Sequence, residues 1–293
     1  MEKSSVYFTK EITPKTLVKV YDTLHVNLKG KVAVKISTGE PGGNNFLQPV
    51  LIKDLVHKLN GTIVECNTAY KGKRSSNADH WQTFKDHGFM AIAPCDLMDE
   101  DGEIALPVKG GKQLKENFVG NHLGNYDSMV ILSHFKGHPM GGFGGALKNM
   151  SIGVASAHGK IVIHSHGTID VDFKSALTTD HDSFLESMAD ADLAVMDYMH
   201  RENIVYVSVA NRLSVDCDCV SNPCEPEMAD IGIFASLDPV ALDQACVDAV
   251  YNSNDPGKKA LIERIESRNG IHTVETALEL GLGSREYELI GLY

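Results

Sequence analysis

The strand-like run Ser128–His134 (SMVILSH) constrains the fold more than any other feature of this 293-residue chain. Its central residues Met129–Leu132 are apolar without alternation, so both faces of a strand formed here must be buried. Strands of this kind belong to parallel sheets that helices cover on both sides. Shorter β-branched runs alternate with amphipathic stretches along the rest of the chain. The sequence therefore predicts an α/β fold with a mostly parallel sheet flanked by helices.

The same patterns locate the individual elements. The predicted strands are Val32–Ile36, Thr62–Cys66, Ser128–His134, Leu193–Met196 and Ile204–Val209. The predicted helices are Leu47–Leu59, Asn77–Lys85, Pro239–Tyr251 and Gly257–Arg268. The best-marked helix start is Asp238-Pro239, because Asp favours the N-cap and Pro the first helical position. We expect a single domain over residues 1–293, with two closely packed lobes, 1–160 and 161–293, and a cleft between them.

The charge balance restricts the partners of the chain. It carries 27 Lys and Arg against 39 Asp and Glu, a formal net charge of −12. This balance disfavours nucleic acid and anionic membranes, since no excess of basic residues is present to displace counterions. Met1–Ser5 lacks the apolar core of a signal peptide, and no apolar run reaches the roughly 18–20 residues that span a bilayer. We therefore expect a cytoplasmic protein whose six cysteines are free thiols or metal ligands.

The segment 134–149 (HFKGHPMGGFGGALKN) is the richest in chemistry. It leaves a buried strand, passes through five glycines and predicts a helix from about Gly145. Glycines let backbone N–H groups approach a ligand, while a helix N-terminus and lysines add positive charge. The predicted anion-binding residues are Lys148, Asn149, Gly144, Gly145 and, from elsewhere in the chain, Arg74. The predicted catalytic residues are His134, His138 and Lys136, since imidazole titrates near neutral pH.

The alternative for this segment is a glycine-rich turn that serves packing alone. Two histidines and two lysines in one short stretch make that alternative the weaker one. Neither a Walker A loop nor a Rossmann glycine fingerprint is present in the sequence. Elsewhere, His80 is expected to be a structural histidine, Cys246 a core residue and Asp238 a helix cap.

A second candidate site is the run Asp216-Cys217-Asp218-Cys219, followed by Cys224. Thiolates beside carboxylates raise one another's pKa, so such a run is unfavourable unless a cation or hydrogen-bond donors lie nearby. Cys217, Cys219 and Cys224 are therefore predicted ligands of a metal ion or an iron–sulfur cluster, with a further ligand from elsewhere. The spacing matches neither zinc Cys-x-x-Cys pairs nor ferredoxin motifs. A surface loop that happens to hold cysteines is the competing interpretation.

These motifs together resemble a known family. The segment 134–149, the Asp-Cys-Asp-Cys run and residues 226–248 occur in an order similar to that of the uncharacterised iron–sulfur centre proteins, the family of domain of unknown function 362. The resemblance extends upstream to Lys35–Glu40 and to Tyr70–Arg74. It implies a metal or iron–sulfur centre, and a two-lobed plan distantly similar to that of nickel-pincer lactate racemases. The ferredoxin-like insert of many relatives is missing, because residues 153–215 contain no cysteine.

Three functional hypotheses follow. The preferred one is a metal-dependent enzyme that acts on a small anionic molecule by redox or isomerisation chemistry. The second is a non-enzymatic carrier or assembly factor for a metal or cofactor, which would need exposed thiols. The third is a family member without metal, in which Cys217 and Cys219 serve local structure.

Overall fold

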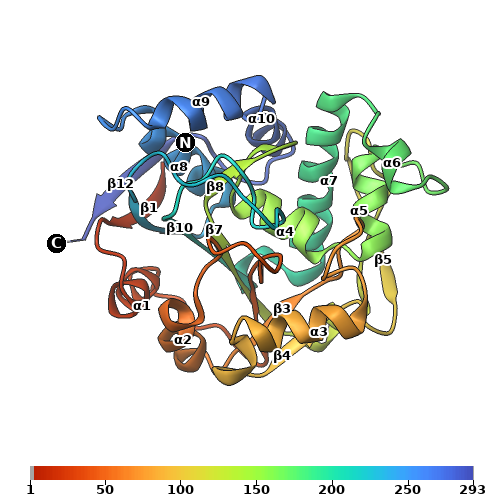
Figure 1. Cartoon of the computed structure of the whole chain (residues 1–293), viewed down its shortest axis with the longest axis horizontal. Coiled ribbons are helices and arrows are strands. Elements are labelled where there is room, and N and C mark those ends of the chain that lie inside the picture. Colours follow the sequence, from red (N-terminus) through yellow and green to blue (C-terminus); the bar gives the residue numbers. More distant parts are fainter. Residues whose placement is uncertain (1–2, 293) are drawn as a thin grey trace.

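The computed structural model describes residues 3–292 and contains one large sheet. Its strand order is β12-β1-β11-β10-β7-β2-β3-β4 (Figure 1). These strands are β1 (Ser4–Thr9), β2 (Val32–Lys35), β3 (Thr62–Glu65), β4 (Cys95–Leu97), β7 (Ser128–His134), β10 (Ile204–Ala210), β11 (Gly232–Ser236) and β12 (Tyr287–Gly291). In the described part of the chain, only β11 runs antiparallel to its neighbours in this sheet. The predicted mostly parallel α/β fold is confirmed.

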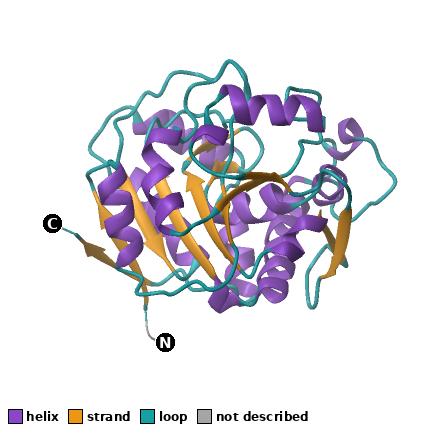
Figure 2. Cartoon of the chain, turned by 90° about the horizontal axis from the view of Figure 1, so that it is seen from below, coloured by secondary structure: helices purple, strands orange, loops and turns teal. Residues whose placement is uncertain are grey.

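Helices cover both faces of the sheet (Figure 2). One face packs against α1 (Pro14–Asp22), α2 (Pro49–Lys58) and α3 (Asn77–Asp86). The other face packs against α4 (Ala146–Val154), α7 (His181–Met199), α8 (Pro239–Tyr251), α9 (Lys258–Ser267) and α10 (His272–Glu279). Two further helices, α5 (Ala157–His164) and the one-turn α6 (Phe173–Ala176), lie beside α7. The protein is thus a three-layer α/β/α sandwich.

Strand β7 lies near the middle of the sheet and is buried along its whole length. Met129 and Ile131 point into the core on one face, whereas Val130 and Leu132 point into the core on the other. This arrangement explains why the apolar residues of the strand do not alternate with polar ones.

Helix α8 begins as predicted. The Asp238 carboxylate accepts hydrogen bonds from the N–H groups of Val240 and Ala241, and Pro239 occupies the first helical turn. Both features satisfy or remove N–H groups that would otherwise lack a partner at the start of a helix. Cys246 on this helix is fully buried, as expected for a core residue.

One predicted strand is wrong. Leu193–Met196 lies within α7, a 19-residue helix rather than a strand. Most residues of its second half, including these four, are buried, because the helix packs against α4, α5 and α10. A helix that is apolar on all sides has no 3.6-residue pattern, so a short window of it cannot be distinguished from a buried strand.

Smaller elements complete the chain. β5 (Glu103–Pro107) pairs with β6 (Glu116–Gly120), and β8 (Lys136–His138) pairs with β9 (Gly142–Gly144), both antiparallel. Short 3-10 helices span Phe89–Ala91, Asn121–Asn125 and Arg201–Asn203. The large sheet takes strands from both sides of residue 160, and the division into lobes at that point stays a prediction. Within residues 3–292, no helix is both long and apolar enough to cross a membrane.

Candidate functional site

A cavity of about 300 Å³ lies at the carboxyl ends of β2, β3 and β7. The chain leaves β2 through α2 on one face of the sheet and returns as β3. It leaves β7 through α4 to α7 on the other side and returns as β10. The boundary between β2 and β7 is therefore the point where the strand order reverses, which is where open α/β sheets bind their ligands.

The two segments singled out in the sequence meet at this cavity. Gly137 N–H donates to the carbonyl oxygen of Ser214 at 2.8 Å. A Cβ atom at Gly137 would lie 2.3 Å from the carbonyl oxygen of Val215, so only glycine permits this close approach. Segments 134–149 and 213–227 thus form adjoining walls of one pocket.

His134 and Lys136, from the first segment, both contact Asp218, from the second. His134 Nδ1 lies 2.8 Å from Asp218 Oδ1, and its Nε2 lies 2.7 Å from the carbonyl oxygen of Asn211. Both ring nitrogens face oxygen acceptors, so neither offers a lone pair to the cavity. Lys136 Nζ forms an ion pair with Asp218 Oδ2 at 2.9 Å. Burial alone would raise the pKa of Asp218, but His134 and Lys136 lower it.

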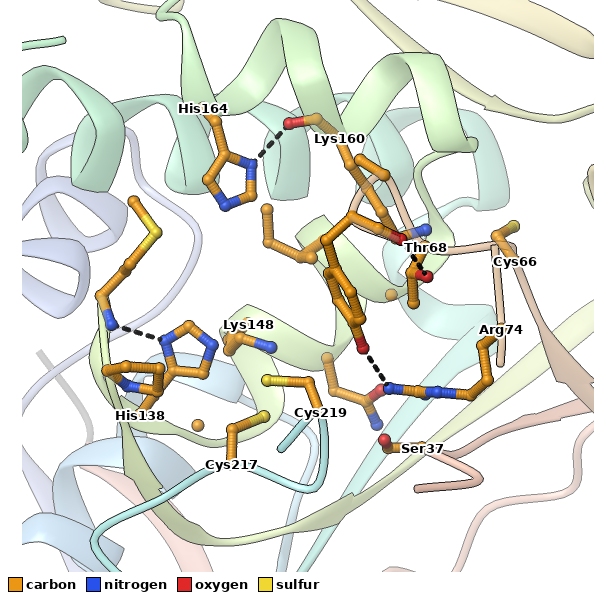
Figure 3. Close-up of a pocket in the computed structure, with 18 of the residues that line it drawn as sticks. Ser37, Cys66, Thr68, Arg74, His138, Lys148, Lys160, His164, Cys217 and Cys219 are labelled. Atoms are coloured by element: carbon orange, nitrogen blue, oxygen red, sulfur yellow. Dashed lines mark hydrogen bonds between the residues drawn. The ribbon is translucent and has the colours of Figure 1, made fainter. Parts of the chain in front are cut away.

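His138, Cys217 and Cys219 form a cluster in the pocket wall (Figure 3). One potential ligand atom from each lies within 4.8 Å of the other two. A hydrogen bond from Cys219 lowers the pKa of the Cys217 thiol well below its usual range, and Lys148 and His138 lower it further. The same hydrogen bond raises the pKa of Cys219. This hydrogen bond therefore favours the thiolate at Cys217 and the thiol at Cys219.

The ring of His138 has a defined orientation. Its Nδ1 accepts hydrogen bonds from the N–H groups of Met140 (3.2 Å) and Gly141 (2.8 Å). Nε2 is then the protonated nitrogen of the neutral ring, and the side chain hydrogen-bonds to Cys217. Burial lowers the pKa of His138 to about 4, so the ring is neutral at physiological pH.

Cys224, the third predicted ligand, lies outside the cluster. It is exposed, and its backbone N–H donates to Asp216 Oδ2 at 3.0 Å. Asp216 in turn forms an ion pair with Arg264 at 3.4 Å. The two carboxylates of the run therefore have different roles. Asp216 binds the backbone of its own loop, and Asp218 binds His134 and Lys136 in the neighbouring segment.

The pocket is strongly basic. The cationic side chains in its lining are Lys35, Lys136, Lys148, Lys160 and Arg74. Arg74 is engaged by Glu40 (3.1 Å) and Glu65 (3.4 Å). Lys148 differs from the other four, because its ammonium group forms no hydrogen bond or ion pair with any residue from 3 to 292. Its half-buried ammonium group points toward the thiols (Figure 3).

The remaining predicted anion-binding residues have structural partners. Asn149 donates to the carbonyl oxygens of Lys35 and Leu132, both at 3.2 Å, and so joins the ends of β2 and β7. Gly144 and Gly145 line the cavity beside the start of α4. The first N–H groups of that helix, Ala146 and Leu147, donate to the buried carboxylate of Asp243. Those two N–H groups therefore donate to a carboxylate in the core and not to a ligand in the cavity.

Sequence reasoning missed two lysines and a cysteine of this lining. Lys35 and Lys160 are almost fully buried, and burial lowers the pKa of Lys35 to about 8. Their signal in the sequence is a single lysine within an apolar stretch, VAVKI and GKIVI. Burial raises the pKa of the Cys66 thiol to about 12, and this thiol donates to the carbonyl oxygen of Val154.

His164 also lines the pocket. Its Nδ1–H donates to the carbonyl oxygen of Lys160 at 2.6 Å, so Nε2 is an acceptor. Nε2 has no hydrogen-bond partner in the described chain and faces the cavity (Figure 3). The ring stacks on Phe184 at 4.7 Å and meets the edge of Phe173 at 5.5 Å. His80, by contrast, is held by Glu65 and Asn67 as the predicted structural histidine.

Fold and site together define an α/β protein with a basic, thiol-containing pocket at the carboxyl edge of a mostly parallel sheet. The chain belongs to the family described as domain of unknown function (DUF362), whose sequence profile matches residues 32–248. This confirms the family resemblance seen in the motifs. No curated protein matches the chain.

Two solved structures are similar to this one. The lactate racemase apoprotein from Thermoanaerobacterium thermosaccharolyticum has a TM-score of 0.47 and 12% sequence identity, over 83% of this chain and 56% of that one. A structural-genomics protein from Thermotoga maritima has a TM-score of 0.45 and 12% identity, over 87% of this chain and 58% of that one. The present chain thus spans little more than half the length of either.

Proposed function

We propose that this protein is a cytoplasmic enzyme that uses a metal ion held by Cys217, Cys219 and His138 to act on a small organic anion. The observation that carries the proposal is the convergence of these three groups in a cavity lined by five cationic side chains. Two thiolates and one imidazole suit zinc and other borderline or soft metals, and three protein ligands leave a coordination position open. Such a metal would supply Lewis-acid or redox chemistry.

The cysteines of this chain favour a single ion over an iron–sulfur cluster. Cubane and plant-type clusters are held by four cysteines, but only Cys217 and Cys219 lie together here. Cys224 is exposed. Cys66 lines the same cavity but lies outside the cluster and donates to the carbonyl oxygen of Val154, and Cys95 and Cys246 lie elsewhere, in β4 and α8.

Burial favours an enzyme over a carrier. A carrier must present its metal to a partner, which requires exposed thiols. Cys217 is only 3% exposed, and Lys136 and His138 around it are also buried. Lys148 and its neighbours would bind and orient the anion, while His164 Nε2 is an acceptor for a proton on the bound molecule.

Metal analysis of anaerobically purified protein tests the proposal. We expect about one metal ion per chain, lost in the double variant Cys217→Ser/Cys219→Ser and retained in Cys224→Ser, which removes an exposed thiol from the same loop. Slow loss of metal to a mild chelator would support the enzyme, and rapid loss the carrier. Sub-stoichiometric metal that is the same in the wild type and the double variant would overturn the metal site.

A metal-free thiol centre is the second candidate, and one observation favours it. The two N–H groups that donate to His138 Nδ1 keep the proton on Nε2, and coordination through Nε2 requires its loss. In that alternative His138 and Cys219 both donate hydrogen bonds to a reactive Cys217 thiolate. Metal-free protein in which Cys217 is alkylated faster than Cys224 at pH 6 would support it.

A further inference from the structure

The lining of the pocket contains two kinds of side chain. The cationic side chains come from the end of β2, from β8, from α4 and α5, and from the loop between β3 and α3. The apolar side chains are those of Pro139, Met140, Ile152, Phe173, Leu177 and Phe184. A ligand that fills the cavity must contact both kinds of surface.

Two of the apolar residues that line the cavity, Phe173 and Leu177, do not belong to the hydrophobic core. Ile152 and Phe184 belong to a hydrophobic cluster between α4, α5 and α7, against which Met140 also packs. Phe173 and Leu177, from α6 and the residue that ends it, belong to none of the three clusters of the described chain. Leu177 is 42% exposed although it lines the cavity.

The position of α6 is nevertheless fixed. Asp172 caps its N-terminus by accepting a hydrogen bond from Ser175 N–H, and Ala176 is buried. The Thr179 hydroxyl, just beyond the helix, donates to the carbonyl oxygen of His164. The Phe173 ring lies 5.5 Å from the His164 ring and 6.4 Å from the Tyr70 ring. The helix thus holds an apolar surface against the cavity.

Neither an inorganic anion nor a neutral apolar molecule satisfies this lining. An inorganic anion would pair with Lys148 but leave Phe173 and Leu177 facing water. A neutral molecule would cover those two side chains but desolvate the Lys148 ammonium without giving it a partner, which is unfavourable. A cavity of about 300 Å³ has room for a ring with a short substituent.

We propose that the ligand of this pocket is an amphipathic organic acid, with its carboxylate or phosphate on Lys148 and its ring-sized apolar body under Phe173 and Leu177. This inference rests on the anion-binding half of the proposed function and names the class of molecule bound. It assigns to α6 the selection of ligands by the size of their apolar part.

The test is a titration, followed by ligand-observed NMR, of two matched series against the purified protein of known metal content. The first series is acetate, butanoate, phenylacetate and 3-phenylpropanoate. The second is inorganic phosphate and phenyl phosphate, which distinguishes the two head groups. In at least one series, we expect the ring-bearing acid that binds best to bind at least about tenfold more tightly than the smallest compound of that series, acetate or inorganic phosphate.

Three variants locate the two contacts. Phe173→Ala and Leu177→Ala should each remove most of the affinity that the ring adds. The affinity for acetate or phosphate should stay within about twofold of the wild-type value. Lys148→Met should weaken all members of the bound series by about tenfold. The matched controls are Ile169→Ala, an exposed apolar residue before α6, and Lys174→Met, an exposed lysine on α6. Both controls should bind as the wild type does.

The inference is overturned if no ring-bearing acid binds more than twofold more tightly than acetate in the first series or inorganic phosphate in the second. It is equally overturned if the gain persists in both Phe173→Ala and Leu177→Ala, with folding of each variant checked by its melting temperature. Metal content is measured on the same samples. If the protein holds stoichiometric metal but the ring does not increase affinity, only this inference is contradicted. If the ring increases affinity but the protein holds no metal, only the metal site is contradicted.

Discussion

The Lys136 ammonium lies 2.9 Å from the Asp218 carboxylate, and both side chains are buried. This ion pair joins the segment that follows β7 to the loop that carries Cys217 and Cys219. His134 lies on the same carboxylate, so one acidic group holds both walls of the pocket together. The contact also explains how the Asp-Cys-Asp-Cys run tolerates so much negative charge.

We expect Lys136→Met to destabilise the fold by about 3 kcal/mol, because it removes the lysine that pairs with a buried carboxylate and leaves His134 as the remaining side-chain partner. The matched control is Lys148→Met, which removes a lysine of the same segment that has no ion pair and should cost less than about 1 kcal/mol. Urea unfolding at pH 7 measures both. Equal destabilisation by the two substitutions would show that the pair is not a structural support.

The pH dependence of this pair has a defined sign. The folded-state pKa of Asp218 is lowered, so its stabilising contribution is present above the unfolded value of about 3.9 and is lost as the pH falls through the folded value. Asp218→Asn should therefore reduce stability at pH 7, and the reduction should shrink as the pH falls below the unfolded value of about 3.9.

The two lysines Lys35 and Lys136 should titrate differently although they share one cavity. Burial lowers the pKa of Lys35 to about 8, whereas Asp218 raises that of Lys136 above its usual range. NMR of protein labelled with ¹³C-lysine should show one side-chain signal with a midpoint near pH 8. That signal should be absent from Lys35→Met and present in Lys136→Met. A Lys35 signal that titrates only above pH 10 would contradict the prediction.

His164 should make the protein sensitive to mild acid. Burial lowers its folded-state pKa to about 4, whereas the unfolded value is about 6.5. Between these values the unfolded chain binds a proton that the folded chain does not, so stability falls as the pH decreases from 6.5 toward 4. From pH 7 to pH 5 we expect the wild type to lose about 2 kcal/mol more than His164→Gln.

Urea unfolding at several pH values measures this difference, and His158→Gln is the control, since that histidine is only partly buried on α5 and is paired with Glu103. Parallel pH profiles for the wild type and His164→Gln would rule out a neutral, buried His164. Long-range ¹H–¹⁵N NMR should in addition show the proton of His164 on Nδ1 at pH 7.

The sequence predicts the sheet better than it predicts the site. Strand β7 and helix α8 are determined by local signals, a non-alternating apolar run and an Asp-Pro cap, and both are where the sequence indicated. Strand β11 was missed, although it is short and fully buried, because it follows an irregular loop and runs against its neighbours. Nothing local in the residues of Gly232–Ser236 specifies that direction.

Within the site, the sequence identified the two segments but not their pairing. The sequence predicts that a cation or hydrogen-bond donors offset the charge of the Asp-Cys-Asp-Cys run, but it does not identify the partners of Asp218, which are His134 and Lys136, more than 80 residues earlier. Similarly, the sequence predicts Arg74 as an anion-binding residue but gives no sign of the two glutamates that pair with it. Such partners are set by tertiary contacts, which residue spacing does not encode.

The shared sheet has a consequence for partial chains. β7 is flanked by β2 from the first half of the sequence and by β10 from the second. A fragment that stops before β10, whether from truncation or during synthesis, would expose one edge of β7, a seven-residue strand rich in apolar side chains. Unpaired edges of this kind associate with one another. The first half of the protein should therefore need a chaperone, or its own second half, to remain in solution.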